Sequence, residues 1–217
     1  MTLFKICGLR DVDSAVIARE YAASFLGFVF VPGVRRELSV KQVAQITSEY
    51  RLLCGSGGPL LVGLFANQSP EFVNSAIEEC GLDFAQLCGD ELADYYDKIS
   101  ARVIKQIKVP IEGDFQKIVS DTIKKVGSVL DSGSVPLLDR LDKGHLGGTG
   151  KSFDWNVAAS LPKDWEFILA GGLNPANVSE AISSVRPWAV DISTGVETLG
   201  LKDPSKIKAF SEAVLTS

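Results

Sequence analysis

The chain of 217 residues is 46% hydrophobic and 23% charged, with a formal net charge of -5, which fits one compact soluble domain over residues 1–217. The acidic balance argues against binding to nucleic acid, because no basic stripe is available to displace counterions from a phosphate backbone. No secretory pattern opens the chain and no apolar stretch is long enough to span a membrane, so we expect a cytoplasmic protein with no membrane partner.

Short apolar runs alternate with helical patterns along the whole chain. In the first half of the chain, strands are expected at 3–7, 24–30, 60–65 and 84–87. The helices that follow them are expected at 12–21, 40–51, 70–80 and 91–99. Ser39 and Gln42 form a Ser-x-x-Gln capping box at the start of the second helix. Asp90 is the expected cap of the fourth helix.

The second half of the chain continues in the same way. Its strands are expected at 102–107, 135–139, 167–169 and 188–192. The helices that follow them are expected at 115–125, in a short stretch after Asp154, at 175–185 and at 204–214. The end of the fifth helix stays open, because Gly127 can close it or the chain can remain helical to Leu130. Asn174 is the expected N-cap of the seventh helix, with Pro175 at its first position.

Eight strand-then-helix units in one chain predict a parallel sheet with right-handed crossovers. Such a series either closes as a barrel or stays open as a doubly wound sheet. An open sheet more often has a Gly-x-Gly-x-x-Gly turn after its first strand, which the turn CGLR at 7–10 lacks. The predicted fold is therefore α/β, a single-domain (β/α)8 TIM barrel.

The seventh and eighth expected strands both end in clusters of small residues. Backbone N–H groups exposed there can cradle an anion without Lys or Arg, and the loops after these two strands commonly bind phosphate in such barrels. Tight turns are the alternative role of the glycines. The residues expected to bind the phosphate of a small-molecule substrate are Gly171, Gly172, Ser193, Thr194 and Gly195.

Reactive groups of a β/α barrel belong at the carboxyl ends of its strands, where Cys7 ends the first and Asp139 the sixth. A cysteine there is more often a small buried hydrophobe, and an aspartate a cap or turn residue. Above a phosphate site, a thiol and a carboxyl group can also act as base and acid. All cysteines, including Cys54, Cys80 and Cys88, are expected to be thiols in a reducing compartment, because their spacing matches no metal site.

Seven short motifs, in a fixed order and spacing, carry a resemblance to a known family. They are KICG at 5–8, LVGLFAN at 61–67, LDFAQLCGDE at 82–91, LLD at 137–139, GGTGKSFDW at 147–155, LAGGLNPANV at 169–178 and VDISTGVET at 190–198, followed by GLKDPSKI at 200–207. Through them nearly the whole chain resembles the N-(5'-phosphoribosyl)anthranilate isomerase family, enzymes of tryptophan biosynthesis.

The resemblance implies a β/α barrel and an Amadori rearrangement of an aminoaldose into an aminoketose, with no cofactor and no metal. It makes Asp139 the general acid, which protonates the furanose ring oxygen and opens the sugar to a Schiff base. It makes Cys7 the general base, which removes the C2 proton that the iminium acidifies. Strand alternation puts Lys5 on the same face as Cys7, either to favour the thiolate or as a salt-bridge partner inside the barrel.

The resemblance also implies a cation for the anthranilate carboxylate in the loop after the second strand, which here reads PGVRRELS. Arg36, three residues before Ser39, matches the family position better than Arg35 does. A pair of solvated arginines is the alternative. Asp191, near the end of the eighth strand, is implied either to orient the substrate amine or to serve as a structural acceptor.

The chain departs from the family at Cys88, where the usual motif is Gln-Leu-His-Gly, and this loss is expected to alter substrate positioning or rate. The only histidine, His145, is expected to face solvent. A single histidine argues against a metal-dependent pentose-phosphate epimerase on the same barrel. An indole-glycerol-phosphate synthase would need catalytic lysines at strand ends, and apart from Lys5 none is evident. A catalytically silent phosphosugar-binding domain is the remaining alternative, and the presence of both Cys7 and Asp139 argues against it. Fusion to other tryptophan-pathway domains stays open.

Overall fold

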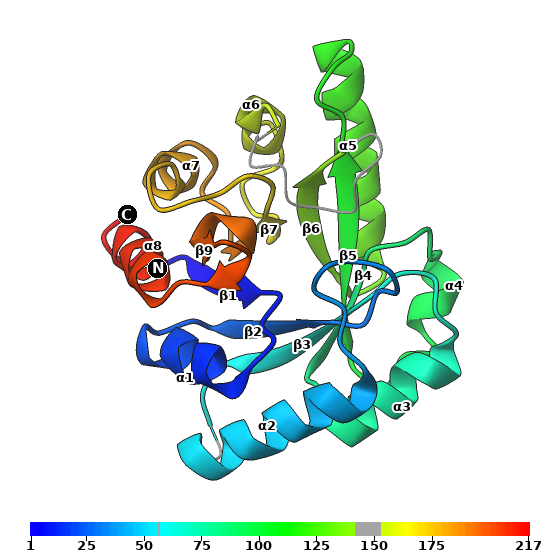
Figure 1. Ribbon diagram of the computed structural model, residues 1–217. Coiled ribbons are helices and arrows are strands. Elements are labelled where there is room, and N and C mark those ends of the chain that lie inside the picture. The colour runs from blue at the N-terminus through cyan, green and yellow to red at the C-terminus, as the bar shows by residue number, and fades with distance from the viewer. Residues whose placement is uncertain (56, 142–152) are drawn as a thin grey trace. The chain divides into compact units, whose positions relative to one another are not determined.

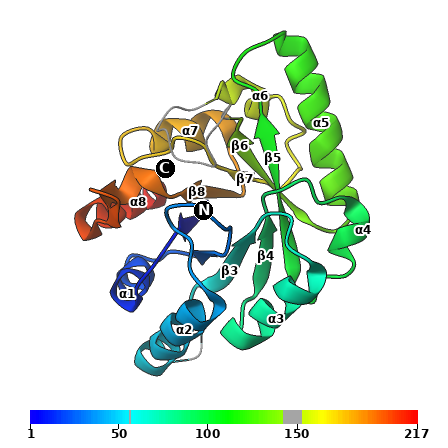
Figure 2. The ribbon, with the colours of Figure 1, turned by 45° about the vertical axis from the view of Figure 1, so that its right-hand side comes forward.

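The computed structural model describes residues 1–55, 57–141 and 153–217. Within these ranges eight parallel strands follow one another in chain order as one closed barrel, which confirms the predicted α/β fold. Most elements are labelled in Figure 1, and β8 is labelled in Figure 2. The barrel strands are β1 (Leu3–Cys7), β2 (Phe25–Val29), β3 (Leu60–Phe65), β4 (Phe84–Leu87), β5 (Arg102–Val109), β6 (Val135–Arg140), β7 (Ile168–Leu169) and β8 (Ala189–Ile192).

Helices follow the strands, and a short addition separates the last strand from the last helix. This addition is a 3-10 turn, η1 (Thr194–Val196), and a ribbon of β9 (Glu197–Thr198) and β10 (Leu201–Lys202), none of which the sequence predicted. The helices are α1 (Val12–Glu20), α2 (Val40–Cys54), α3 (Pro70–Cys80), α4 (Ala93–Tyr96), α5 (Phe115–Asp131), α6 (Trp155–Ala159), α7 (Val178–Val185) and α8 (Pro204–Leu215).

The chain divides into two compact units. We call Lys5–Ile104 the N-terminal unit, and Met1–Phe4 with Lys105–Ser217 the C-terminal unit. The assignment of residues 1–217 to a single domain stays a prediction. No helix in the described ranges is long and apolar enough to cross a membrane.

In the N-terminal unit, β2, β3 and β4 pair in parallel, and α1, α2 and α3 lie in a row beside them (Figures 1 and 2). Aromatic side chains fill the space between strands: Phe25 meets Phe84 edge to face at 5.8 Å, and Phe30 stacks on Phe65 at 4.9 Å. Edge-to-face and offset contacts of this kind add to the stabilisation that apolar burial gives. They hold the strand ends of this unit in place.

In the C-terminal unit, the register of β6, β7 and β8 aligns their carboxyl ends. Leu138 pairs with Leu169, and Leu169 pairs with Val190. Asp139 and Asp191 each follow a residue of this row, so the pairing places them at the same level on strands that flank β7. Helices α6, α7 and α8 pack side by side in this unit (Figure 2).

The predicted capping box at α2 is confirmed. The backbone N–H of Ser39 donates to Gln42 Oε1 at 2.9 Å, and the N–H of Gln42 donates to Ser39 Oγ at 3.3 Å. Helix α5 takes the longer of the two predicted courses and runs through Gly127. A Cβ on Gly127 would lie 3.2 Å from the ring of Trp165, so this glycine gives the ring room and does not end the helix.

Two predicted caps are wrong. Helix α4 begins after Leu92, and the backbone N–H of Asp90 donates to Asn67 Oδ1 at 2.8 Å in a loop contact. Helix α7 begins after Asn177, because Asn174 forms a local turn in which its Oδ1 accepts from the N–H of Ala176 at 2.9 Å. Asn and Asp side chains compete with helices by closing turns of this kind.

Candidate active site

The end of β1 brings Cys7 and Lys5 onto one face. Cys7 pairs with Gly27 of β2, and a Cβ added to Gly27 would lie 3.1 Å both from Cys7 Sγ and from Lys5 Cε. The alternation predicted for β1 is therefore confirmed. Lys5 is fully buried and Cys7 is 5% exposed, so the glycine leaves just the room that these two side chains fill.

Cys88 stands at the position of the family's usual histidine. Burial raises the pKa of its thiol to about 12, against the smaller lowering effects of the Gln86 side chain and the Lys5 charge. The amide Nε2 of Gln86 lies 3.5 Å from Cys88 Sγ. At neutral pH this thiol supplies neither the cation nor the base that an imidazole can supply.

The carboxyl group of Asp139 is held at both oxygens. Gln106 of β5 donates its Nε2 to Oδ2 at 2.7 Å, and the backbone N–H of Arg140 donates to Oδ1 at 2.8 Å. A Cβ on Gly171 would lie 3.1 Å from Oδ1, so the β7 loop passes directly beside this carboxyl group. Sequence reasoning missed Gln106, because β5 reads RVIKQIKV and Gln106 is only one of several polar residues in this strand.

The two loops predicted to bind phosphate touch each other. Gly171 and Gly172 have φ of 87° and 74°, a backbone that side chains rarely adopt. A Cβ on Gly195 would lie 2.1 Å from the carbonyl oxygen of Leu173 and 3.1 Å from Cα of Asn174. Only glycine permits this approach, so the structure brings the predicted residues of the β7 and β8 loops together.

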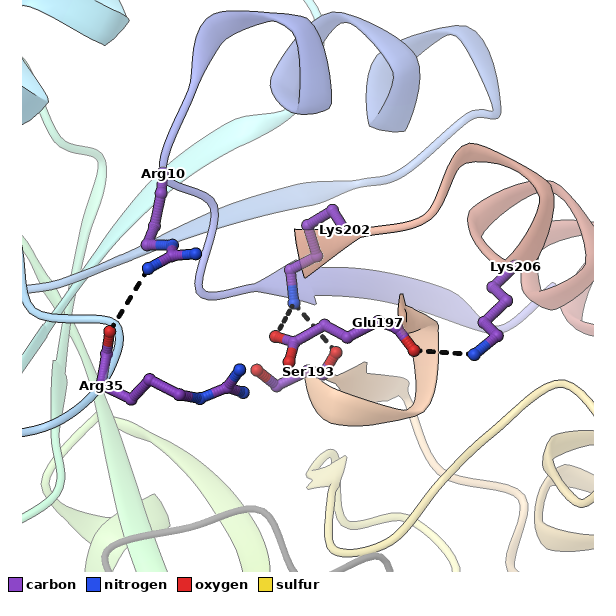
Figure 3. Close-up of polar contacts among 6 residues, drawn as sticks. All are labelled: Arg10, Arg35, Ser193, Glu197, Lys202 and Lys206. Carbon is purple, nitrogen blue, oxygen red and sulfur yellow. Dashed lines mark hydrogen bonds and ion pairs between the residues drawn. The ribbon is translucent and has the colours of Figure 1, made fainter. Parts of the chain in front are cut away.

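The loop after β2 folds back on its own strand and carries both candidate arginines. The N–H of Leu38 donates to the carbonyl oxygen of Val29 at 2.8 Å. Arg10 donates to the carbonyl oxygen of Arg35 at 3.5 Å (Figure 3). Arg35 is exposed and Arg36 half-buried, which keeps Arg36 the better candidate for holding a ligand carboxylate.

A buried ion pair lies directly after the β8 loop, and sequence reasoning assigned it no role. Lys202 and Glu197 are 3% and 6% exposed, with 3.0 Å between Nζ and Oε1. Lys202 Nζ also donates to the carbonyl oxygen of Ser193 at 2.9 Å, and Lys206 Nζ donates to the carbonyl oxygen of Glu197 at 2.7 Å (Figure 3). A hairpin signal was present, since Gly200 separates two short stretches whose pairing places Glu197 opposite Lys202.

Two features named from the sequence lie outside the described residues: His145, which is expected to face solvent, and most of the motif at 147–155. Asp191 is half-buried on β8, and its predicted role stays a prediction. Within the ranges that the structure describes, no three His, Cys, Asp or Glu residues are grouped so that they could hold a metal ion.

Comparison with known proteins identifies the family. The family profile described as N-(5'phosphoribosyl)anthranilate (PRA) isomerase matches residues 4–213. Curated relatives named N-(5'-phosphoribosyl)anthranilate isomerase include one from Dehalococcoides mccartyi, 38% identical over 97% of this chain and 94% of its own, and one from Desulforudis audaxviator, 41% identical over 97% and 96%.

Solved structures agree with the sequence relatives. Phosphoribosyl anthranilate isomerase from Thermotoga maritima superposes with a TM-score of 0.83 at 31% identity, over 100% of both chains. A phosphoribosyl anthranilate isomerase in complex with reduced 1-(o-carboxyphenylamino)-1-deoxyribulose 5-phosphate superposes with a TM-score of 0.78 at 29% identity, again over 100% of both. The chain therefore belongs to the N-(5'-phosphoribosyl)anthranilate isomerase family, a family of enzymes of tryptophan biosynthesis.

Proposed function

We infer that this enzyme converts N-(5'-phosphoribosyl)anthranilate into 1-(2-carboxyphenylamino)-1-deoxyribulose 5-phosphate by an Amadori rearrangement. The observation that carries the inference is the identity of 38% and 41%, over 97% of the chain, with enzymes of that name. The test is steady-state turnover of phosphoribosylanthranilate, followed by the loss of its fluorescence. Absence of turnover in correctly folded protein would favour a silent phosphosugar-binding domain.

Asp139 is the proposed general acid of the ring-opening step. It gives its proton to the furanose ring oxygen, the C1–O bond breaks, and the nitrogen lone pair forms the iminium. One hydrogen bond reaches each carboxyl oxygen, from Gln106 Nε2 to Oδ2 and from the backbone N–H of Arg140 to Oδ1. These two donors fix the plane of the carboxyl group, which general acid catalysis requires.

Cys7 is the proposed general base of the second step. Its thiolate removes the C2 proton, and the electrons of the C2–H bond move toward the iminium nitrogen, which gives an enolamine that tautomerises to the aminoketose. The thiolate, not the thiol, is the reactive form, and a positive charge nearby favours it. Lys5 supports this assignment, because it is fully buried and a Cβ added to Gly27 would lie 3.1 Å from both Lys5 Cε and Cys7 Sγ.

Phosphate binding is assigned to the loops that contain Gly171, Gly172 and Ser193, Thr194, Gly195. Their contact at Gly195 and the positive φ of the two β7-loop glycines support this assignment. Backbone N–H groups hold an anion without a dedicated cation. The phosphate then anchors one end of the substrate. Asp191 of β8 is proposed to orient the amine at the other end.

Arg36→Ala should mainly raise KM. The guanidinium is proposed to hold the anthranilate carboxylate before and during the reaction, and such uniform binding appears in KM rather than in kcat. The expected increase is about tenfold or more, since a hydrogen bond to a charged group contributes roughly 1.5 to 3 kcal/mol. Arg35→Ala, in the same turn but exposed, is the matched control and should keep a normal KM. A large loss of kcat at unchanged KM would contradict this role.

Gln106→Leu should lower kcat by about tenfold at unchanged KM, because the Asp139 carboxyl loses the donor that fixes Oδ2. In an Asp139→Asn background the same substitution should have little further effect, since residues that act as a unit are not additive. Steady-state kinetics of the four proteins measures this. Equal losses in both backgrounds would show that Gln106 acts on the fold and not through Asp139.

The setting of the enzyme is also proposed. Cytoplasmic location is proposed because the spacing of the four cysteines suits free thiols of a reducing compartment. The enzyme acts on a small phosphorylated substrate. Fusion to other tryptophan-pathway domains is compatible with this function, because a β/α barrel builds its site from its own strand-end loops.

A further inference from the structure

We propose that Lys202 and Glu197 are positioning residues that orient the backbone of the Ser193–Thr194–Gly195 loop and thereby set the affinity for the substrate phosphate. This inference rests on the proposed function, in which that loop binds the phosphate. It concerns the motif at 200–207, to which the mechanism assigns no part. The ion pair that carries it is shown in Figure 3.

The contact between Lys202 and Ser193 fixes one peptide plane. Lys202 Nζ donates to the carbonyl oxygen of Ser193 at 2.9 Å. In a trans peptide the C=O and the following N–H point in opposite directions, so the N–H of Thr194 is directed away from Lys202. Ser193 has φ of -127° and ψ of -81°, outside the regular helix and strand regions, so this plane needs a partner to hold it.

Lys202 is itself held firmly. The β9–β10 ribbon places Glu197 directly opposite it, with 3.0 Å between Nζ and Oε1. The backbone where η1 meets β9 is tied to the start of α8 at two points: the N–H of Asp203, the N-cap of α8, donates to the carbonyl oxygen of Val196 at 2.9 Å, and Lys206 Nζ donates to the carbonyl oxygen of Glu197 at 2.7 Å. These contacts hold the backbone of Glu197, which in turn holds Lys202.

The pair acts by orientation rather than by its field. Glu197 neutralises the charge of Lys202 at contact distance, so little net attraction is left for a distant anion. A buried ion pair is also a weak source of stability, because desolvation of the two charges offsets much of their attraction. A fixed hydrogen bond to the carbonyl oxygen of Ser193 is what the pair provides that an apolar pair cannot.

The loop is then held from both sides. On one side Lys202 holds the carbonyl of Ser193, and on the other Gly195 lies against the β7 loop, where a Cβ would come 2.1 Å from the carbonyl oxygen of Leu173. The loop between these two points has little freedom. Preorganised N–H groups bind an anion more tightly than groups that must be ordered on binding.

The test is Lys202→Met, which keeps an unbranched side chain and removes the ammonium. The KM for substrate and the Ki for inorganic phosphate should each rise about tenfold or more, as expected for loss of a charge-assisted contact, with kcat within about threefold of wild type. Lys208→Met is the matched control, since the side chain of Lys208 lies on α8, the helix that follows the ribbon, and is 53% exposed. It should change neither constant.

Glu197→Gln covers the case in which Lys202→Met does not fold. It is nearly isosteric and weakens the anchor of Lys202, so it should raise the same two constants by a smaller factor, and Lys202→Arg should restore part of the affinity. Normal KM and Ki in folded Lys202→Met or Glu197→Gln protein, whatever happens to thermal stability, would overturn the proposal. Failure of the phosphate assignment itself is seen separately, as a normal Ki for phosphate in Gly172→Val.

Discussion

Cys7→Ser should lower kcat by at least about a hundredfold while the fold stays intact, as expected for loss of a general base. A serine hydroxyl is far less acidic than a thiol, so it cannot reach the anionic form that removes the C2 proton. The two side chains are similar in size, and Cys7 is only 5% exposed, so packing against Gly27 changes little. The measurement is the loss of substrate fluorescence, with circular dichroism to confirm the fold.

Asp139→Asn should give a loss of the same size, because the amide keeps the shape of the carboxyl group but cannot protonate the ring oxygen. Cys54→Ser is the control for both, since Cys54 ends α2 and is assigned no role in the site. Turnover like that of wild type in Cys7→Ser or Asp139→Asn would reject the corresponding assignment. Reduced turnover in Cys54→Ser would instead indicate a general effect on stability.

Gly195→Val and Gly172→Val should each abolish measurable binding of inorganic phosphate and of substrate. At Gly195 the first added carbon would lie 2.1 Å from the carbonyl oxygen of Leu173, so one of the two loops must move. At Gly172 the φ of 74° is strained for valine, so the substitution should distort the loop assigned to the anion. Ser193→Ala should lose only about one hydrogen bond to a charged group, roughly 1.5 to 3 kcal/mol.

Gly133→Val is the matched control for Gly172→Val. Gly133 has nearly the same φ, 73°, and an added Cβ would meet nothing within 4 Å, so this variant carries the backbone strain without touching the loops. It should keep a normal Ki for phosphate. In crystals grown with phosphate or sulfate, an anion should lie between the two loops. Density beside Arg35 instead, with the N–H groups of Gly171 and Ser193 facing away, would contradict the assignment.

Most of the barrel could be predicted because its strands and helices are encoded locally. The capping box at Ser39 and the left-handed Gly81 after α3 are signals within one or two turns of chain. The caps at Asp90 and Asn174 were wrong because the same residue types also close turns and bind loops. Choosing between these outcomes needs knowledge of partners such as Asn67, which is 23 residues away.

The site was predictable where function follows strand ends and unpredictable where it depends on contacts between distant segments. Cys7 and Asp139 could be proposed because β/α barrels place chemistry at these ends. Gln106 lies 33 residues from Asp139, and the pairing of their side chains depends on how β5 and β6 lie together. Lys202 and Glu197 are only five residues apart, but the two-residue strands that pair them are too short to show any periodicity, which left Gly200 as a weak hairpin signal.

Gly27 has a consequence for how the chemistry of this barrel can change over generations. A Cβ added to Gly27 would lie 3.1 Å from both Cys7 Sγ and Lys5 Cε, so these two side chains already fill the space beside the glycine. A longer base at position 7, such as glutamate or histidine, would therefore compete with Lys5 for this space. Gly27 is already the smallest residue and cannot yield more space. Descendants that adopt another base are thus expected to change positions 5 and 7 together, which couples the substitution history of two residues.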